Sequence, residues 1–233
     1  SYRYAFFKIE VGEKEFGYNL LTQIVKNKNV PFDLRKEALV SLSNDTASKV
    51  DEELFSLLIK EYPNEESARL VYASYLLLKG DTVAFRYIEE ALAINPQIEN
   101  SWVALASYRL ENNNPELLYE TCENGLEQYP DNTDMLYMLG VAQIQQKDTL
   151  SAIKTWGKIV KLAIDGNDKM LASSILGHIG DTYSSMEKKS EAFVAYDSAL
   201  VYNENNIVVL NNYAYYLSLE NKDLDRAERM SGK

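Results

Sequence analysis

A pattern of about 34 residues recurs along most of this chain, and few folds can accommodate such a repeat. The clearest copy is Ser173–Asn206, in which large apolar residues at helical spacing form two stretches on either side of a polar break at Glu187–Ser190. Each stretch also contains small residues, such as Gly180, which allow two helices to approach closely. One amphipathic helix pair cannot bury its apolar faces alone, so successive pairs must stack. The repeat therefore predicts an all-α fold built from stacked antiparallel helix pairs.

The register of the repeat is regular except at one place. Trp102 and Leu136 occupy the same position of successive copies and are 34 residues apart, and the same spacing separates Leu176 from Leu210. Between Leu136 and Leu176 the spacing is 40, so six additional residues lie near Asp165–Ala172. We interpret them as either a longer loop between repeats or an extension of a helix.

This register divides the chain into consecutive segments that we expect to form one continuous solenoid domain. The segments are 1–30, a degraded N-terminal helix pair; 31–64, a repeat-like pair; 65–98 and 99–132, two repeats; 133–172, a repeat with an extended loop; 173–206, a repeat; and 207–233, a truncated repeat that stops within its second helix.

The repeat resembles the tetratricopeptide repeat (TPR) family, whose units have this length and two helices each. The resemblance rests on columns that recur in phase, namely bulky Trp102, Leu136, Leu176 and Leu210; the Leu-Gly-like pairs at 105–106, 139–140, 179–180 and 213–214; and Ala84, Ala152, Ala192 and Ala227. Tyr- and Asn-rich acidic arrays of this kind resemble bacterial members of the family. The resemblance implies a right-handed α-solenoid superhelix in which the first helix of each pair lines a concave groove that binds a protein or peptide.

The same resemblance selects the side chains expected to line this groove. These predicted groove residues are Asn100, Val103, Ser107, Tyr137, Val141, Ile144, His178, Asp181, Asn211, Asn212 and Tyr215, and Leu70, Ser74, Leu77 and Gly177 are expected to face the same way. Aromatic rings can anchor a partner segment, and asparagine amides can bond its main chain. The family's best-defined subgroup grips a C-terminal carboxylate with Lys, Arg and Asn. Here only Asn212 matches, so a carboxylate clamp is not expected.

The charge of the chain restricts its partners. The net charge is −11 and the pI is about 4.7, which argues against nucleic-acid binding because phosphate contacts need clustered Lys and Arg. An anionic membrane surface is disfavoured for the same reason. The predicted partner is a protein or peptide segment that is neutral to basic, or hydrophobic.

Residue types with catalytic or metal-binding chemistry do not form a recognisable set. His178 is the only histidine and has no second ligand at a zinc-type spacing, and Cys122 falls in an inward column of a second helix without a histidine partner. Glutamate pairs such as Glu52-Glu53 lie at helix starts, where carboxylates favour the helix dipole. The sequence therefore predicts a non-enzymatic protein with no metal and no cofactor.

Function and location remain open between a few alternatives. The favoured interpretation is a protein- or peptide-binding scaffold that uses the groove of the TPR superhelix. The alternatives are a helical accessory or sensor segment of a larger enzyme or regulator, and self-association as a homo-oligomer through the truncated last repeat. No apolar run approaches the roughly 18 residues of a membrane span. One cysteine fits either the cytoplasm or the periplasmic side of a bacterial cell envelope, and a start at Ser1 is consistent with a removed targeting segment.

Overall fold

The computed structural model describes residues 2–45, 49–221 and 223–231, and all regular secondary structure within these residues is α-helical. The helices are α1 (Tyr2–Glu10), α2 (Lys14–Lys26), α3 (Phe32–Asn44), α4 (Glu53–Glu61), α5 (Glu66–Leu78), α6 (Ala84–Ile94), α7 (Glu99–Glu111), α8 (Pro115–Gln128), α9 (Thr133–Gln145), α10 (Thr149–Asp165), α11 (Lys169–Ser185), α12 (Lys189–Tyr202), α13 (Ile207–Leu219) and α14 (Leu224–Ser231). The predicted all-α fold class is confirmed. None of these helices combines the length and the hydrophobicity that a membrane-spanning segment needs.

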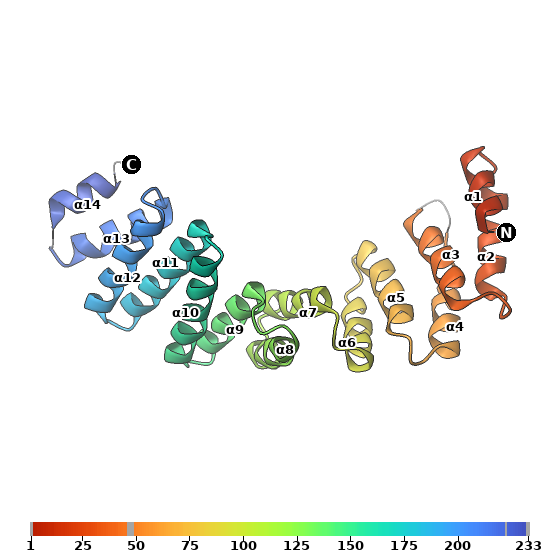
Figure 1. Ribbon diagram of the computed structural model, residues 1–233, viewed down its shortest axis with the longest axis horizontal. Coiled ribbons are helices and arrows are strands. Elements are labelled where there is room, and N and C mark those ends of the chain that lie inside the picture. The colour runs from red at the N-terminus through yellow and green to blue at the C-terminus, as the bar shows by residue number, and fades with distance from the viewer. Residues whose placement is uncertain (1, 46–48, 222, 232–233) are drawn as a thin grey trace. The chain divides into compact units, whose positions relative to one another are not determined.

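The chain divides into two compact units, Ser1–Ser101 (unit 1) and Trp102–Lys233 (unit 2), and the division falls within α7. Figure 1 shows helices joined by short turns into antiparallel hairpins in each unit. The expectation of one continuous solenoid domain therefore stays a prediction.

Unit 1 has the two-layer packing of a helical solenoid. Besides the contacts between consecutive helices, α3 packs against α5 and α2 packs against α4, so alternate helices form separate layers. Apolar residues at helical spacing, such as Leu21 and Val25 of α2 and Leu54, Phe55 and Leu58 of α4, are fully or almost fully buried between these layers. The helix periodicity of the sequence thus places the core where adjacent hairpins meet.

Unit 2 repeats this arrangement from α8 to α14. Consecutive helices pack on one another, and α11 also contacts α13, the first helix of the next pair. The predicted bulky positions Leu136 and Leu210 are buried, as are the predicted small positions Ala152 and Ala192. The column that the sequence identified by its 34-residue spacing is therefore the inward face of the hairpins.

Asparagine and aspartate begin several helices of unit 2. The side chains of Asn132, Asp148, Asp168 and Asn206 each accept a hydrogen bond from a backbone N–H in the first turn of the following helix. These caps satisfy donors that a helix start leaves unpaired. They fix where each helix begins and so which side chains each face presents.

The six additional residues extend two helices, so the expectation of an extended loop in segment 133–172 is wrong. Both α10 and α11 have 17 residues, and only 166–168 separate them. The insertion supplies apolar residues that continue the helical stripes, including Ala163 and Ala172, which are buried. The expected boundary after residue 172 lies inside α11. The alternative interpretation, an extension of a helix, is confirmed.

Glycines mark the closest approach within two hairpins of unit 2. A Cβ at Gly140 of α9 would lie 2.0 Å from Nε1 of Trp156 on α10, and a Cβ at Gly180 of α11 would lie 2.6 Å from the ring of Tyr196 on α12. Both glycines and both aromatic side chains are buried. The sequence prediction that a small residue allows close approach is confirmed at these two positions.

The glycine contact gives a test of this packing. Gly140→Ala should destabilise unit 2 by about 1–3 kcal/mol because the added methyl group overlaps the rigid indole of Trp156. Gly157→Ala is the matched control in α10, since apart from its chain neighbours and the nearby backbone of its own helix no atom lies within 4 Å of its Cβ position, and it should stabilise by up to about 1 kcal/mol. Urea unfolding followed by tryptophan fluorescence measures both, because Trp102 and Trp156 lie in unit 2. Equal effects of the two substitutions would contradict the packing.

A buried arginine joins three helices of unit 1. Arg35 of α3 is 0% exposed; its Nε donates to the carbonyl oxygen of Val25 on α2 at 2.7 Å, and its Nη1 donates to Oε2 of Glu61 on α4 at 2.7 Å. Nη1 also lies 3.2 Å from the Tyr62 hydroxyl. The hydrogen bond from Arg35 lowers the pKa of Glu61 below its ordinary value of 4.5. The stabilisation is therefore complete above pH 4.5 and is lost as the pH falls through the depressed pKa.

Glu61→Gln should destabilise unit 1 by roughly 3 kcal/mol at neutral pH because it leaves the Arg35 charge buried without a counterion. It should also reduce the loss of stability in acid, since the substituted residue no longer titrates. Urea unfolding followed by circular dichroism across acid and neutral pH measures both effects. Glu90→Gln is the control, because Glu90 pairs with Arg69 at 3.2 Å with 43% of its side chain exposed, and it should cost less than about 1 kcal/mol. A similar cost for the two substitutions would contradict the role of Glu61 as the counterion of the buried Arg35.

Candidate functional site

A pocket of about 420 Å³ lies among α7, α9, α10 and α11 of unit 2. This central pocket is lined by Val103, Ser107, Thr133, Asp134, Tyr137, Met138, Ile159, Leu171 and Ile175. Three of the predicted groove residues, Val103, Ser107 and Tyr137, are among them. All but one of the lining side chains come from first helices of pairs, which is the layer in which the sequence places its groove.

The N-terminal half of α9 supplies most of the polar groups of the central pocket. Asn132 caps this helix by accepting from the backbone N–H of Met135 at 2.8 Å, which places Asp134 in the first turn and Tyr137 one turn later. The indole Nε1 of Trp156 donates to the carbonyl oxygen of Tyr137 at 3.1 Å. The capping bond and the indole bond fix the part of α9 that faces the pocket.

Three aromatic rings connect the central pocket to the exposed surface of α11. The ring of Tyr137 is stacked on that of Trp156, with centroids 5.9 Å apart, and lies 5.5 Å from the ring of His178. Trp156 and His178 are 6.0 Å apart. Trp156 is buried, Tyr137 is half-buried and His178 is exposed. The rings therefore run from the core to the solvent, and a partner can reach His178 and the outer edge of Tyr137.

Asp181 is at the centre of a second cluster, one turn beyond His178 on α11. Its Oδ1 accepts from the hydroxyl of Tyr196 at 2.6 Å, and the Nδ2 of Asn212 on α13 lies 2.9 Å from Oδ1 and 3.0 Å from Oδ2. Burial and the hydrogen bond to Asp181 both raise the pKa of Tyr196. The phenol therefore stays protonated and donates. Asp181 and Asn212 are both half-buried, and the structure brings these two predicted groove residues together.

The remaining predicted groove residues vary in exposure. Asn100, Asn211 and Tyr215 are exposed, and Tyr215 retains 59% of its accessible surface. Val141 and Ile144 are half-buried and pack against the core cluster that contains Trp156. Gly177 is wrongly predicted, because it is buried and a Cβ there would lie 2.7 Å from Val209. It allows α11 and α13 to approach and does not face a groove.

Unit 1 contains a pocket that lies outside the predicted groove residues of unit 2. It lies between α3 and α5, has a volume of about 370 Å³, and is lined by Lys36, Val40, Ser43, Asn44, Ser67, Leu70, Val71, Ser74, Tyr75 and Leu78. The sequence predicts that Leu70, Ser74 and Leu77 face the groove. Of these three residues, Leu70 and Ser74 line this pocket and Leu77 does not. The α3 wall of this pocket could have been predicted from the sequence, because Lys36, Val40 and Ser43 are spaced i, i+4 and i+7 and therefore lie on one face of the helix.

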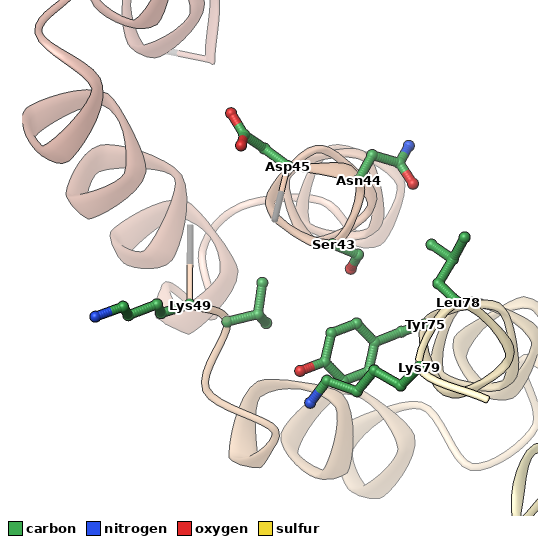
Figure 2. A pocket seen from close by; sticks show the side chains of 8 residues that line it. Ser43, Asn44, Asp45, Lys49, Tyr75, Leu78 and Lys79 are labelled. Carbon is green, nitrogen blue, oxygen red and sulfur yellow. The ribbon is translucent and has the colours of Figure 1, made fainter. Parts of the chain in front are cut away.

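The pocket continues at the C-terminal ends of these helices as a second cavity of about 450 Å³. Figure 2 shows residues that line this cavity, among them Ser43 from α3 and Tyr75 and Leu78 from α5. The ammonium group of Lys79 lies 4.3 Å from the centroid of the Tyr75 ring and 2.8 Å from Oε1 of Glu52. The lysine beside this cavity is thus already paired within unit 1.

The residues that the sequence considered for catalysis have structural surroundings. Cys122 is completely buried in the core beside Leu118 and Met135, and burial raises the pKa of its thiol to about 12. Glu52 pairs with Lys79, and the hydrogen bond from Lys79 lowers the pKa of Glu52. Within residues 2–45, 49–221 and 223–231, no group of three or more His, Cys, Asp or Glu could hold a metal ion.

Comparisons with known proteins find solved structures with a similar fold but no match by sequence. No protein-family model matches the chain, and no curated protein matches it. Among solved structures, the C-terminal part of a TPR repeat-containing protein from Cytophaga hutchinsonii matches with a TM-score of 0.69 and 17% identity, over 99% of this chain and 92% of that one. The chain has the fold of tetratricopeptide repeat proteins.

Two further TPR structures extend the comparison. YrrB, described as a TPR protein with an unusual peptide-binding site, matches with a TM-score of 0.57 and 13% identity, over 91% of this chain and 99% of YrrB. The PilF protein of Pseudomonas aeruginosa matches with a TM-score of 0.57 and 16% identity, over 85% of this chain and 90% of PilF. At these identities the likeness concerns the TPR fold alone.

The environment of Cys122 predicts its reactivity. The native chain should react with iodoacetamide at neutral pH at least about a hundredfold more slowly than the urea-unfolded chain, because the thiol is buried and its pKa of about 12 leaves very little thiolate. Mass spectrometry of alkylated protein over time measures both rates, and the unfolded chain is the control. Rapid labelling of the native chain would contradict the buried position of this residue.

Proposed function

We propose that this TPR-fold chain is a non-enzymatic scaffold that binds a protein or peptide segment on the first-helix surface of unit 2. The observation that supports this proposal most directly is the central pocket. It lies among α7, α9, α10 and α11, and it includes Val103, Ser107 and Tyr137 of the predicted groove. Its volume of about 420 Å³ accommodates one large side chain of a partner.

The groups around the central pocket suit a peptide. The pocket lining is mostly apolar and is continued by the rings of Tyr137 and His178. Asn211 and Tyr215 on α13 are also exposed, and their amide and phenol can bond a main chain. Interfaces commonly combine an aromatic or apolar anchor with surrounding polar contacts. YrrB is described as a TPR protein with a peptide-binding site, and by analogy its similar fold supports peptide binding by this chain.

The charge of the chain supports a partner that is neutral to basic, or hydrophobic, and disfavours nucleic acid. The net charge is −11. An acidic surface accelerates encounter with basic segments and repels phosphate backbones. The proposed partner is therefore a protein segment, and the proposed mechanism is docking of that segment along α7, α9, α11 and α13.

The proposal is tested by selecting binders from a display library of short random peptides with the full chain. We expect enriched peptides whose affinity falls roughly tenfold or more in Tyr215→Ala and in Tyr137→Ala, because each substitution removes an aromatic contact. Tyr215→Ala should leave thermal stability nearly unchanged, since the ring is 59% exposed. Tyr137→Ala should cost about 1–2 kcal/mol, since its half-buried ring is stacked on Trp156.

Tyr202→Ala is the matched control, because Tyr202 ends α12, a second helix of the same unit. It should leave the affinity of the selected peptides unchanged. The proposal fails if no peptide is enriched above an unrelated helical protein, or if the enriched peptides bind both groove variants as tightly as the native chain.

A further inference from the structure

The charged side chains of the proposed binding surface have one sign. Among the residues that line the central pocket and the predicted groove residues, Asp134 and Asp181 are the acidic side chains, and none is Lys or Arg. Asp134 lies in the first turn of α9, where the helix dipole favours a carboxylate. Helix stability is therefore a sufficient reason for Asp134.

The helix dipole does not explain the position of Asp181. It lies in the C-terminal part of α11, which ends at Ser185, and a carboxylate near the C-terminus of a helix is disfavoured by the dipole. Within the part of the chain that the structure describes, no Lys or Arg forms an ion pair with it. The groups that donate hydrogen bonds to it are the Tyr196 hydroxyl and the Asn212 amide, which are both neutral. The half-buried carboxylate is thus held in place while its charge is not compensated by the chain.

Asp181 is also connected to the central pocket. Tyr137 lines the pocket and contacts His178, which precedes Asp181 by one turn on α11. Ile175, another residue of the pocket lining, lies six positions before Asp181, or about 9 Å along the helix. An extended peptide spans that distance with roughly three residues.

We infer that the surface recognises a segment with an apolar side chain in the central pocket and a Lys or Arg side chain, roughly three residues away, paired with Asp181. This inference rests on the proposed function and adds the chemistry of the partner. Tyr196 and Asn212 are positioning residues in this arrangement, because their hydrogen bonds orient the carboxylate. An acidic partner segment is excluded, since its charge would lie beside Asp181 without a compensating cation.

The test uses the peptides selected from the random display library by the native chain. The enriched sequences should share an apolar residue and a Lys or Arg at a spacing of roughly three. Replacing that basic residue by alanine should weaken binding to the native chain roughly tenfold, and added salt should weaken binding of the basic peptide but not of its alanine version. These measurements need no protein variant.

Asp181→Asn then assigns the effect to one carboxylate. The substitution keeps an acceptor for Tyr196 and removes the charge, so the basic peptide should bind roughly tenfold more weakly while the alanine version binds as before. Tyr196→Phe should have a smaller effect in the same direction, because the charge remains and only its orientation is lost. Glu204→Gln, an exposed carboxylate in the turn between α12 and α13, is the control and should change neither affinity.

The possible outcomes separate this inference from the proposed function. If peptides are enriched and depend on Tyr137 but lack a basic residue, or if Asp181→Asn weakens the basic and alanine peptides equally, the surface binds peptides and the role of Asp181 is wrong. If acidic peptides are enriched, the inferred charge is also wrong. If no peptide is enriched, the proposed function itself fails.

Discussion

The structure depends on the packing of a large aromatic side chain of one helix directly on a glycine of its neighbour. Trp156 on Gly140 and Tyr196 on Gly180 bring the two helices of a hairpin so close that no Cβ fits between them. This contact buries nearly all of the aromatic surface, since Trp156 is 5% and Tyr196 0% exposed, and large buried rings contribute strongly to hydrophobic stabilisation. Because the contact occurs at the same repeat position in both hairpins, it also keeps their first helices in register.

The same aromatic residues connect the core with the candidate site. Trp156 donates its indole N–H to the carbonyl oxygen of Tyr137, and Tyr196 donates its hydroxyl to Asp181. Each ring is buried against a glycine while its polar atom reaches the layer of first helices. Buried polar atoms of this kind need a partner, and here each partner belongs to a residue of the proposed binding surface. The rigidity of the core is thus transmitted to the groups that would contact a peptide.

The sequence predicted the helices and their inward faces better than it predicted the candidate site. Helical periodicity and the 34-residue spacing located the buried column at Leu136 and Leu210, because a residue that recurs at one repeat position must face the same interface each time. The sequence did not decide whether the six-residue insertion forms a longer loop or extends a helix, because the repeat spacing gives only the number of additional residues and not their conformation. The structure resolved it as longer α10 and α11 helices.

By itself, the sequence determined that the fold is all-α, that helix pairs recur about every 34 residues with one insertion of six residues, and where the core column lies. These follow from local spacing, which a single sequence records. Only the tertiary structure decided that Gly177 is buried against Val209, that Tyr137, Trp156 and His178 form one cluster, and that Asp181 binds Tyr196 and Asn212. Those contacts join residues of different helices, and their existence depends on how side chains orient between helices, which no spacing along the chain specifies.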